Sequence, residues 1–190
     1  MMMADAKDRL EGTAYATGSG SSQPTGVFTA INAVTASRVT STTAATIGLV
    51  DLQSVRRGVP VRYRGNASWV SAPVYADAIK ALGTALSASY STDLTAGNTD
   101  KLLGRPFYES DDAPTTQTTT ALDQEVLCGD FSQFVIVDKP GSMAIEYIPQ
   151  LFALANNLPD GRRGWFAHWR TGSDSTNTAA MRLLVDKTSA

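Results

Sequence analysis

The spacing of apolar residues along the chain predicts three helices. Residues 3–16 carry apolar side chains at intervals of three and four between charged ones, which is the pattern of a short amphipathic helix. The same spacing predicts a helix over 47–57. A third helix is expected from Pro73 to about Ala88, because proline is well suited to the first position of a helix.

Short runs of β-branched and aromatic residues predict strands between these helices. The run 134–138, Phe-Val-Ile-Val-Asp, is almost entirely β-branched and aromatic, so we expect it to be buried on both faces. Segments 143–147 and 165–170 have strand character and predict a long hairpin. The remaining predicted strands are 27–31, 66–70, 102–109 (with a kink), 126–131 and 181–185.

Turn-forming and hydroxyl-rich residues separate these elements. Three glycines and a proline within 17–26 predict a turn that ends the first helix. The Thr/Ala/Ser stretch 35–46 and the Thr-rich segment 115–120 predict exposed loops, and 111–114 predicts a tight turn. Because helices and strands are interspersed without regular alternation, the fold class is expected to be α+β rather than doubly wound.

The composition limits the classes of function. The chain has 190 residues, 43% of them hydrophobic, which suits one ordinary domain or two small ones with a sizeable core. Its net charge of −2 provides no general attraction for nucleic acid or an anionic membrane. We see no apolar run of about 20 residues and no signal-peptide pattern, and therefore expect a soluble protein made in the cytoplasm without a membrane partner.

Residues that carry redox or metal chemistry are scarce. The sequence has one cysteine, Cys128, and one histidine, His168, which excludes an intrachain disulfide and leaves no zinc-like spacing. Neither residue lies in a nucleophile motif, so a small apolar thiol and a half-buried histidine are the favoured interpretations. The glycine-rich segment 17–20 follows a helix rather than a strand, which favours a turn over a phosphate-binding loop.

Two charged clusters stand out. The basic cluster contains Arg56, Arg57, Arg62 and Arg64, and it suits either phosphate contact or, preferably, a helix C-terminus and a subunit contact. The acidic cluster contains Glu109, Asp111 and Asp112; a solvated turn is favoured there over a calcium site or an acid/base pair. The aromatic residues of 165–169 suit a sheet face or subunit contact better than a ligand pocket.

An ordered series of short motifs carries a family resemblance. The quoted segments are Asp-Arg-Leu-Glu at 8–11, Thr-Gly-Ser-Gly at 17–20, Gln-Pro-Thr-Gly-Val at 23–27, Leu-Leu-Gly-Arg-Pro at 102–106, Glu-Ser-Asp-Asp-Ala-Pro at 109–114, Gly-Asp-Phe-Ser-Gln at 129–133, Val-Ile-Val-Asp at 135–138, Arg-Gly-Trp at 163–165 and Trp-Arg-Thr-Gly-Ser-Asp at 169–174. In this order the chain resembles the major capsid proteins of tailed bacteriophages, which have the Hong Kong 97 fold.

The resemblance implies an organisation into domains. Residues 1–26 would be the end of the spine helix and a glycine-rich turn, a remnant of the peripheral domain. Residues 27–140 would form the axial domain, 141–175 the long peripheral hairpin, and 176–190 a return strand to the axial domain with a polar tail. Relative to the family, we expect the N-terminal arm, the extended loop and most of the spine helix to be missing, so that this chain would not close a shell.

The resemblance also implies a structural function without catalysis, cofactor or metal. The expected partner is the chain itself, with hexamers and pentamers expected of the full-length protein, in a virion shell that is made in the bacterial host. Packaged double-stranded DNA is expected as an indirect partner only. Decoration, portal and scaffold proteins are possible partners. Both charged clusters, Arg56, Arg57, Arg62 and Arg64 with Asp111 and Asp112, are candidate subunit contacts, and loops 35–46 and 115–120 are candidates for the capsomer centre. An encapsulin-type shell is the alternative, and a small enzyme using His168 is a more distant one.

Overall fold

The computed structural model describes residues 2–85, 101–141, 143–153 and 158–188. The chain divides into two compact units. Unit 1 consists of residues 1–135 and 173–190, and unit 2 consists of residues 136–172. The chain therefore leaves unit 1 once and returns to it for its C-terminal strand.

A mixed sheet of six strands forms the centre of unit 1. The order across the sheet is β1 (Arg38–Thr40), β10 (Met181–Val185), β5 (Gln124–Gly129), β2 (Ser68–Ser71), β4 (Arg105–Glu109) and β3 (Lys101–Leu102). The central strand pairs are antiparallel, β10 with β5 and β5 with β2, whereas β1 pairs with β10, and β2 with β4, in parallel. The C-terminal strand β10 thus lies inside the sheet, between β1 and β5.

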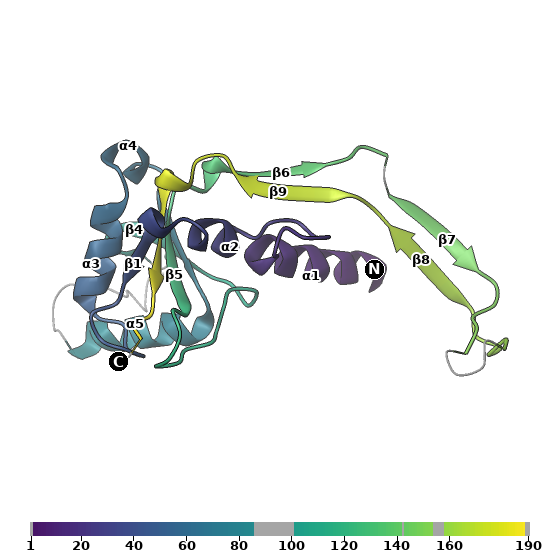
Figure 1. Cartoon of the computed structure of the whole chain (residues 1–190), viewed down its shortest axis with the longest axis horizontal. Coiled ribbons are helices and arrows are strands. Elements are labelled where there is room, and N and C mark those ends of the chain that lie inside the picture. The colour runs from purple at the N-terminus through teal and green to yellow at the C-terminus, as the bar shows by residue number, and fades with distance from the viewer. Residues whose placement is uncertain (1, 86–100, 142, 154–157, 189–190) are drawn as a thin grey trace. The chain divides into compact units, whose positions relative to one another are not determined.

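Helices cover this sheet on both sides. In Figure 1, α3 (Leu49–Gly58) lies to one side of β10 and α2 (Val27–Asn32) to the other, and both helices contact β10. Three consecutive residues of β5, Val126, Leu127 and Cys128, are at most 1% exposed, which requires cover on both faces of the strand. The helices are α1 (Met2–Thr17), α2 (Val27–Asn32), α3 (Leu49–Gly58), α4 (Val61–Arg64) and α5 (Pro73–Ala85), with short 3₁₀ turns at Thr35–Ser37, Phe131–Gln133 and Thr178–Ala180.

Most predicted elements are confirmed. The helix expected over 47–57 is α3, the proline-initiated helix is α5, and the final strand 181–185 is β10. The part of the third predicted helix beyond Ala85 lies outside the described residues. The predicted kinked strand 102–109 is a hairpin, in which Leu103 and Gly104 turn the chain with positive φ values of 50° and 78°.

The strand predicted over 27–31 is wrong, because this segment is helix α2. Its buried residues Val27, Phe28, Ala30 and Ile31 are spaced for one side of a helix and not for alternate faces of a strand. The preceding turn orients the segment: the Gly26 N–H donates to the Gly18 carbonyl at 2.9 Å. Packing in unit 1 therefore overrides the β propensity of the sequence.

The prediction of an exposed loop over 35–46 is also wrong in part. Its residues 38–40 form β1, an edge strand paired with β10. Ser37 and Ser41 are buried, and their hydroxyls donate to the Thr178 carbonyl at 2.9 Å and to Asp186 Oδ1 at 3.1 Å. The small hydroxyl side chains can be buried here because strand and side-chain hydrogen bonds satisfy this segment.

Unit 2 is built on a two-stranded antiparallel ribbon. Strands β7 (Ala144–Ile148) and β8 (Gly164–His168) pair in the register Ala144 to His168 and Ile148 to Gly164, which confirms the predicted hairpin. Strands β6 (Phe134–Asp138) and β9 (Thr171–Ser175) form a second ribbon. The prediction that 134–138 is buried on both faces is wrong: Val135, Ile136 and Val137 are 41–63% exposed, because β6 belongs to a sheet of only two strands.

Candidate assembly surface

The β7–β8 ribbon has one apolar face. Residues directly opposite each other in an antiparallel pair share a face, and successive residues alternate. The register therefore places Ile145 with Ala167, and Tyr147 with Trp165, on the same face. The rings of Tyr147 and Trp165 confirm this, since their centroids are 5.0 Å apart. We call these four residues the ribbon face.

The ribbon face is exposed to solvent in the single chain. Trp165 is 65% exposed, Ile145 51% and Tyr147 46%, although side chains of this kind gain about 1.5–3 kcal/mol each when they are fully buried. The opposite face is mixed: it contains Glu146 and His168 as well as Phe166. A contiguous apolar face on a two-stranded ribbon is typical of an interaction surface.

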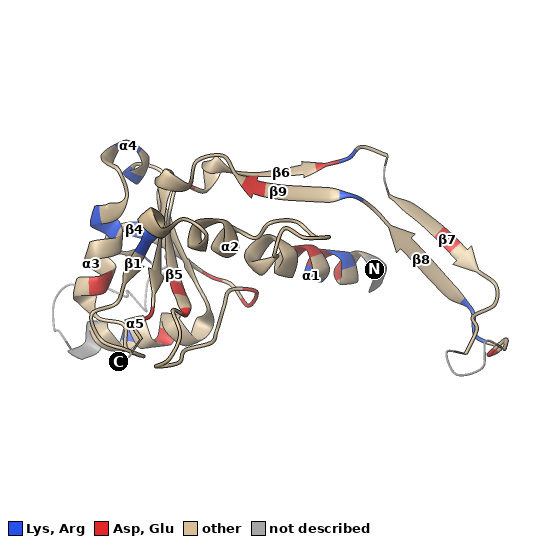
Figure 2. Ribbon diagram, viewed as in Figure 1, with Lys and Arg blue, Asp and Glu red and all other residues tan. Residues whose placement is uncertain are grey.

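The basic cluster lies on α3 and α4 at one end of unit 1 (Figure 2). Arg56 and Arg57 are exposed in the last turn of α3, and Arg62 is exposed on α4, with its guanidinium 4.6 Å from the centroid of the Tyr63 ring. Arg64 has an intrachain function, because it donates to the carbonyls of Val59 and Arg57 at 2.7 Å and so satisfies the C-terminal end of α3.

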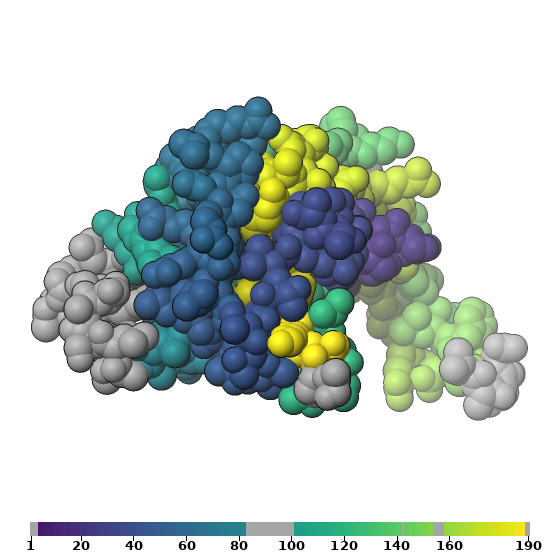
Figure 3. Space-filling view, turned by 60° about the vertical axis from the view of Figure 1, so that its left-hand side comes forward, coloured from purple at the N-terminus to yellow at the C-terminus, as the bar shows by residue number. Residues whose placement is uncertain are grey.

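The space-filling view shows how much of unit 1 this region covers. Residues of α3 and α4, in blue in Figure 3, form a broad part of the visible face beside the C-terminal strand in yellow. Val50 and Val61 lie in this region and are 65% and 75% exposed. Val61 belongs to α4, the helix of four residues that follows α3.

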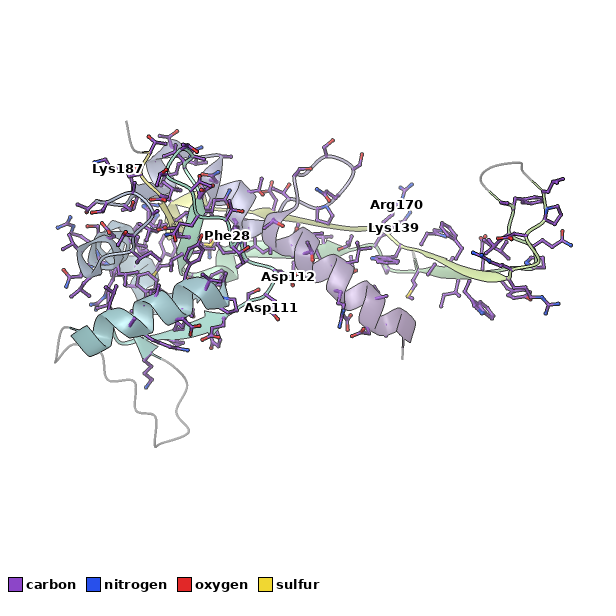
Figure 4. All side chains as sticks on the ribbon, turned by 90° about the horizontal axis from the view of Figure 1, so that it is seen from below. Phe28, Asp111, Asp112, Lys139, Arg170 and Lys187 are labelled. Carbon is purple, nitrogen blue, oxygen red and sulfur yellow. The ribbon has the colours of Figure 1, made fainter. Side chains whose placement is uncertain are left out.

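The acidic cluster lies on β4 and the turn that follows it. Figure 4 shows Asp112 beside α1, and the Thr13 hydroxyl donates to Asp112 Oδ1 at 2.6 Å. Asp111 is exposed in the same turn. Glu109 pairs with Lys80 at 2.6 Å. Asp112 therefore attaches α1 to the rest of unit 1, whereas Asp111 is the residue of this turn that faces solvent.

Cys128, in unit 1, and His168, in unit 2, are the residues that were considered for enzyme chemistry. Cys128 is buried in β5, and burial raises the pKa of its thiol to about 12. His168 is exposed on β8, and its ring lies 5.6 Å from that of Phe166. Within the described ranges, no three His, Cys, Asp or Glu side chains converge as a metal site, and no helix has the length and apolarity to cross a membrane.

Sequence reasoning missed three buried acids, Asp51, Glu125 and Asp186, near the end of the sheet where β10 finishes and β5 begins. Asp51 accepts from Thr42 N–H and Gly48 N–H at 2.9 Å, and Asp186 accepts from Ala45 N–H at 2.8 Å. The third acid, Glu125 on β5, is 0% exposed. Glu125 lies between Gln124 and Val126, directly before the predicted strand 126–131, and no local pattern marked any of the three acids.

Comparison with known proteins finds one matching family and several similar structures. Residues 1–186 match the model of the phage capsid family. The structure is similar to the capsid of a native GTA particle computed with C5 symmetry, with 24% identity, a TM-score of 0.75, and coverage of 98% of this chain and 64% of that one. It is also similar to Gordonia phage Cozz, with 17% identity, a TM-score of 0.61, and coverage of 100% and 62%.

A shell protein of another kind has the same fold. The holo-SrpI encapsulin complex from Synechococcus elongatus PCC 7942 matches with 14% identity, a TM-score of 0.62, and coverage of 97% of this chain and 62% of that one. This chain therefore spans less than two thirds of the length of these structural neighbours. A search of curated proteins gives no match.

These findings define a class of protein, the shell proteins with a Hong Kong 97-like fold, and they confirm the resemblance found in the sequence. Because the family match extends over nearly the whole sequence, the chain belongs to the phage capsid family. It is therefore a structural protein of the phage head class.

Proposed function

We propose that this chain tiles an icosahedral phage head by contact with copies of itself, and that the ribbon face is buried against a neighbouring copy. One observation carries the proposal: Ile145, Tyr147 and Trp165 present an exposed apolar face in a member of the capsid family. The similar GTA capsid was computed with C5 symmetry, and rings of identical subunits need heterologous contacts, in which two different patches of the subunit meet.

The domain assignment is part of this proposal. Residues 27–140 and 176–190 act as the axial domain, 141–175 as the peripheral hairpin, and 1–26 as the end of the spine helix. The division into unit 1 and unit 2 supports it, with boundaries at 136 and 172. Copies assemble as hexamers and pentamers around packaged DNA, which they contain without specific binding. The shell has no catalytic function, and its subunits are made in the host cytoplasm. Decoration, portal and scaffold proteins are the further partners.

Charged contacts between subunits involve Arg56, Arg57, Arg62 and Asp111, the exposed members of the two clusters. Arg64 and Asp112 act within the chain, because their hydrogen bonds hold α3 and α1. Rim charges steer association more than they strengthen it, so their effect depends on salt. If Arg57→Glu and Arg62→Glu in the full-length protein leave assembly unchanged at low and high salt, the charged contact is wrong.

The ribbon face is tested by a matched pair of substitutions in the full-length protein. Trp165→Asp places a charge in the apolar face, whereas His168→Asp places the same charge on the opposite face of the same strand. Shell yield, measured by sedimentation and negative-stain electron microscopy, should fall at least about tenfold for Trp165→Asp, as for loss of an interface aromatic, and less than about twofold for His168→Asp. Equal yields from both variants would refute the proposal.

The encapsulin match favours one alternative, a compartment that encloses an enzyme rather than DNA. The genes beside this one distinguish the two functions. Terminase, portal and protease genes support the phage head, whereas a peroxidase or ferritin-like gene supports the compartment.

A further inference from the structure

The carboxyl group of Glu125 occupies an unusual position at the end of the sheet of unit 1. It lies where the register between β5 and β10 shifts: Val185 faces Gln124 and Leu184 faces Val126, so that Glu125 has no opposite residue. A bulge of this kind changes the direction of the bulged side chain. Although it is an acid, Glu125 is 0% exposed.

Only one of the two carboxyl oxygens has a partner. Oε1 accepts from the Gln117 side-chain amide at 2.8 Å. Oε2 is buried without a hydrogen-bond partner among the described residues. A buried ionised carboxylate with an unsatisfied oxygen is costly, so the closed structure suits the protonated form of Glu125.

The acidic neighbours of Glu125 act in the same direction. The charged groups that act on it come from three separate segments: Asp186 after β10, Asp51 on α3 and Asp123 just before β5. Tyr75 on α5 also interacts with Glu125, and its hydroxyl donates to the Thr116 carbonyl at 2.7 Å. Burial, opposed by the Gln117 hydrogen bond and reinforced by the three acids, raises the pKa of Glu125 to about 7.

The segment 115–123 contacts this carboxyl through Gln117 and is joined by hydrogen bonds to other elements of unit 1. The Tyr75 hydroxyl on α5 donates to the Thr116 carbonyl, the Gln117 amide donates to Glu125 on β5, and the Asp186 N–H after β10 donates to the Asp123 carbonyl at 2.7 Å. Within the segment, Thr118 donates from its N–H and its hydroxyl to Asp123 Oδ2, both at 2.6 Å. The segment has no helix or strand before β5 begins at Gln124. Its side-chain attachment to β5 is therefore made to the group that must change its charge.

We propose that segment 115–123 is a proton-controlled flap: it is closed over protonated Glu125, and it opens when Glu125 ionises and the carboxylate gains access to water. Opening breaks the Gln117 contact, which joins the flap to β5. This device belongs to the single chain and does not depend on assembly into a shell. In a phage head it would make the flap respond to a pH change near neutrality.

The difference in proton affinity between the closed and open states gives the direction in which pH moves the flap equilibrium, and the largest change it can cause. The closed state binds the proton more tightly than an open state with an ordinary Glu pKa of 4.5, so closure is favoured at low pH and is progressively lost up to about pH 7. A pKa decrease from about 7 to 4.5 on opening allows the open-to-closed ratio to rise by at most about 300-fold across this range.

Hydrogen–deuterium exchange at a series of pH values, corrected for the intrinsic pH dependence of exchange, tests the flap. In the wild type, protection of segment 115–123 should fall at least about tenfold between pH 5 and pH 8.5. In Glu125→Gln, which mimics the protonated acid, protection should not change with pH. Gln117→Ala should lower protection at every pH, because an attachment of the flap is lost, and should raise the pH at which protection stops falling, because the amide stabilises the ionised form of Glu125 in the closed state. Glu146→Gln, an exposed acid in unit 2, should behave as the wild type does.

Three outcomes would overturn the proposal. They are a wild-type change smaller than tenfold, a Glu125→Gln variant that keeps the pH response, and an equal loss of protection in β5 and β10. The last result would indicate unfolding of unit 1 instead of a local opening. If Glu125→Gln does not fold, the upward shift expected for Gln117→Ala still decides the question.

Discussion

Replacement of Gly26 by alanine should destabilise unit 1 through a steric clash that no side chain can relieve. A Cβ atom at Gly26 would lie 2.5 Å from each of three backbone atoms, the Ala16 oxygen and the nitrogens of Thr17 and Gly18. The Gly26 backbone itself, with φ −72° and ψ 150°, is open to alanine, so the penalty arises entirely from close packing.

The magnitude follows from how far the backbone must move. Cβ contacts below 3.0 Å are essentially absent from proteins, so the end of α1 must retreat by about 0.5 Å from α2. Overpacking of this kind costs about 1–3 kcal/mol, and loss of the 2.9 Å hydrogen bond from Gly26 to Gly18 adds about 1 kcal/mol. We therefore expect the free energy of unfolding to fall by about 3 kcal/mol.

Urea unfolding followed by circular dichroism at 222 nm measures this loss, because the described α-helices all belong to unit 1. Gly65→Ala is the matched control. A Cβ atom there meets nothing within 4 Å, and the Gly65 backbone is helical with φ −56° and ψ −46°, so this change should be neutral or stabilise by up to about 1 kcal/mol. A Gly26→Ala protein within about 0.5 kcal/mol of the wild type would refute the steric argument.

Two further predictions concern groups within unit 1. The Cys128 thiol, with its pKa raised to about 12 by burial, should react with Ellman's reagent at pH 8 at least about a thousandfold more slowly in the native protein than in urea; a native rate near the unfolded one would contradict its burial. Asp112→Ala should cost about 1 kcal/mol in urea unfolding, because it removes the acceptor of the Thr13 hydroxyl, whereas Asp111→Ala should cost less than about 0.5 kcal/mol. Equal costs would show that the contact with α1 contributes nothing.

Local sequence patterns predicted the elements in which the spacing of apolar residues agrees with the side that the structure buries. α3 and α5 each have one apolar side, and α5 begins at a proline, so their positions could be predicted from a window of about a dozen residues. The β7–β8 hairpin was predicted for the same reason, since its two strands are close in sequence and pair directly. The ordered motifs predicted the family, and the match over residues 1–186 confirms it.

Segments whose burial depends on distant residues were predicted less well. The run 27–31 has the composition of a strand and forms a helix, because the glycine turn before it packs against the end of α1. The run 134–138 has the composition of a buried strand and is exposed, because its ribbon has no further strands. In both cases the deciding contacts come from outside the local window.

The chain's own residue order was enough to establish the α+β class, the principal helices and strands, and membership of the capsid family. Three-dimensional packing alone decided that Glu125, Asp51 and Asp186 are buried at one end of the sheet, and that the apolar side of β7–β8 is left uncovered. The reason is physical: periodicity records which side chains share a face, whereas burial depends on which remote segment, such as β10 against β1 and β5, comes to cover that face.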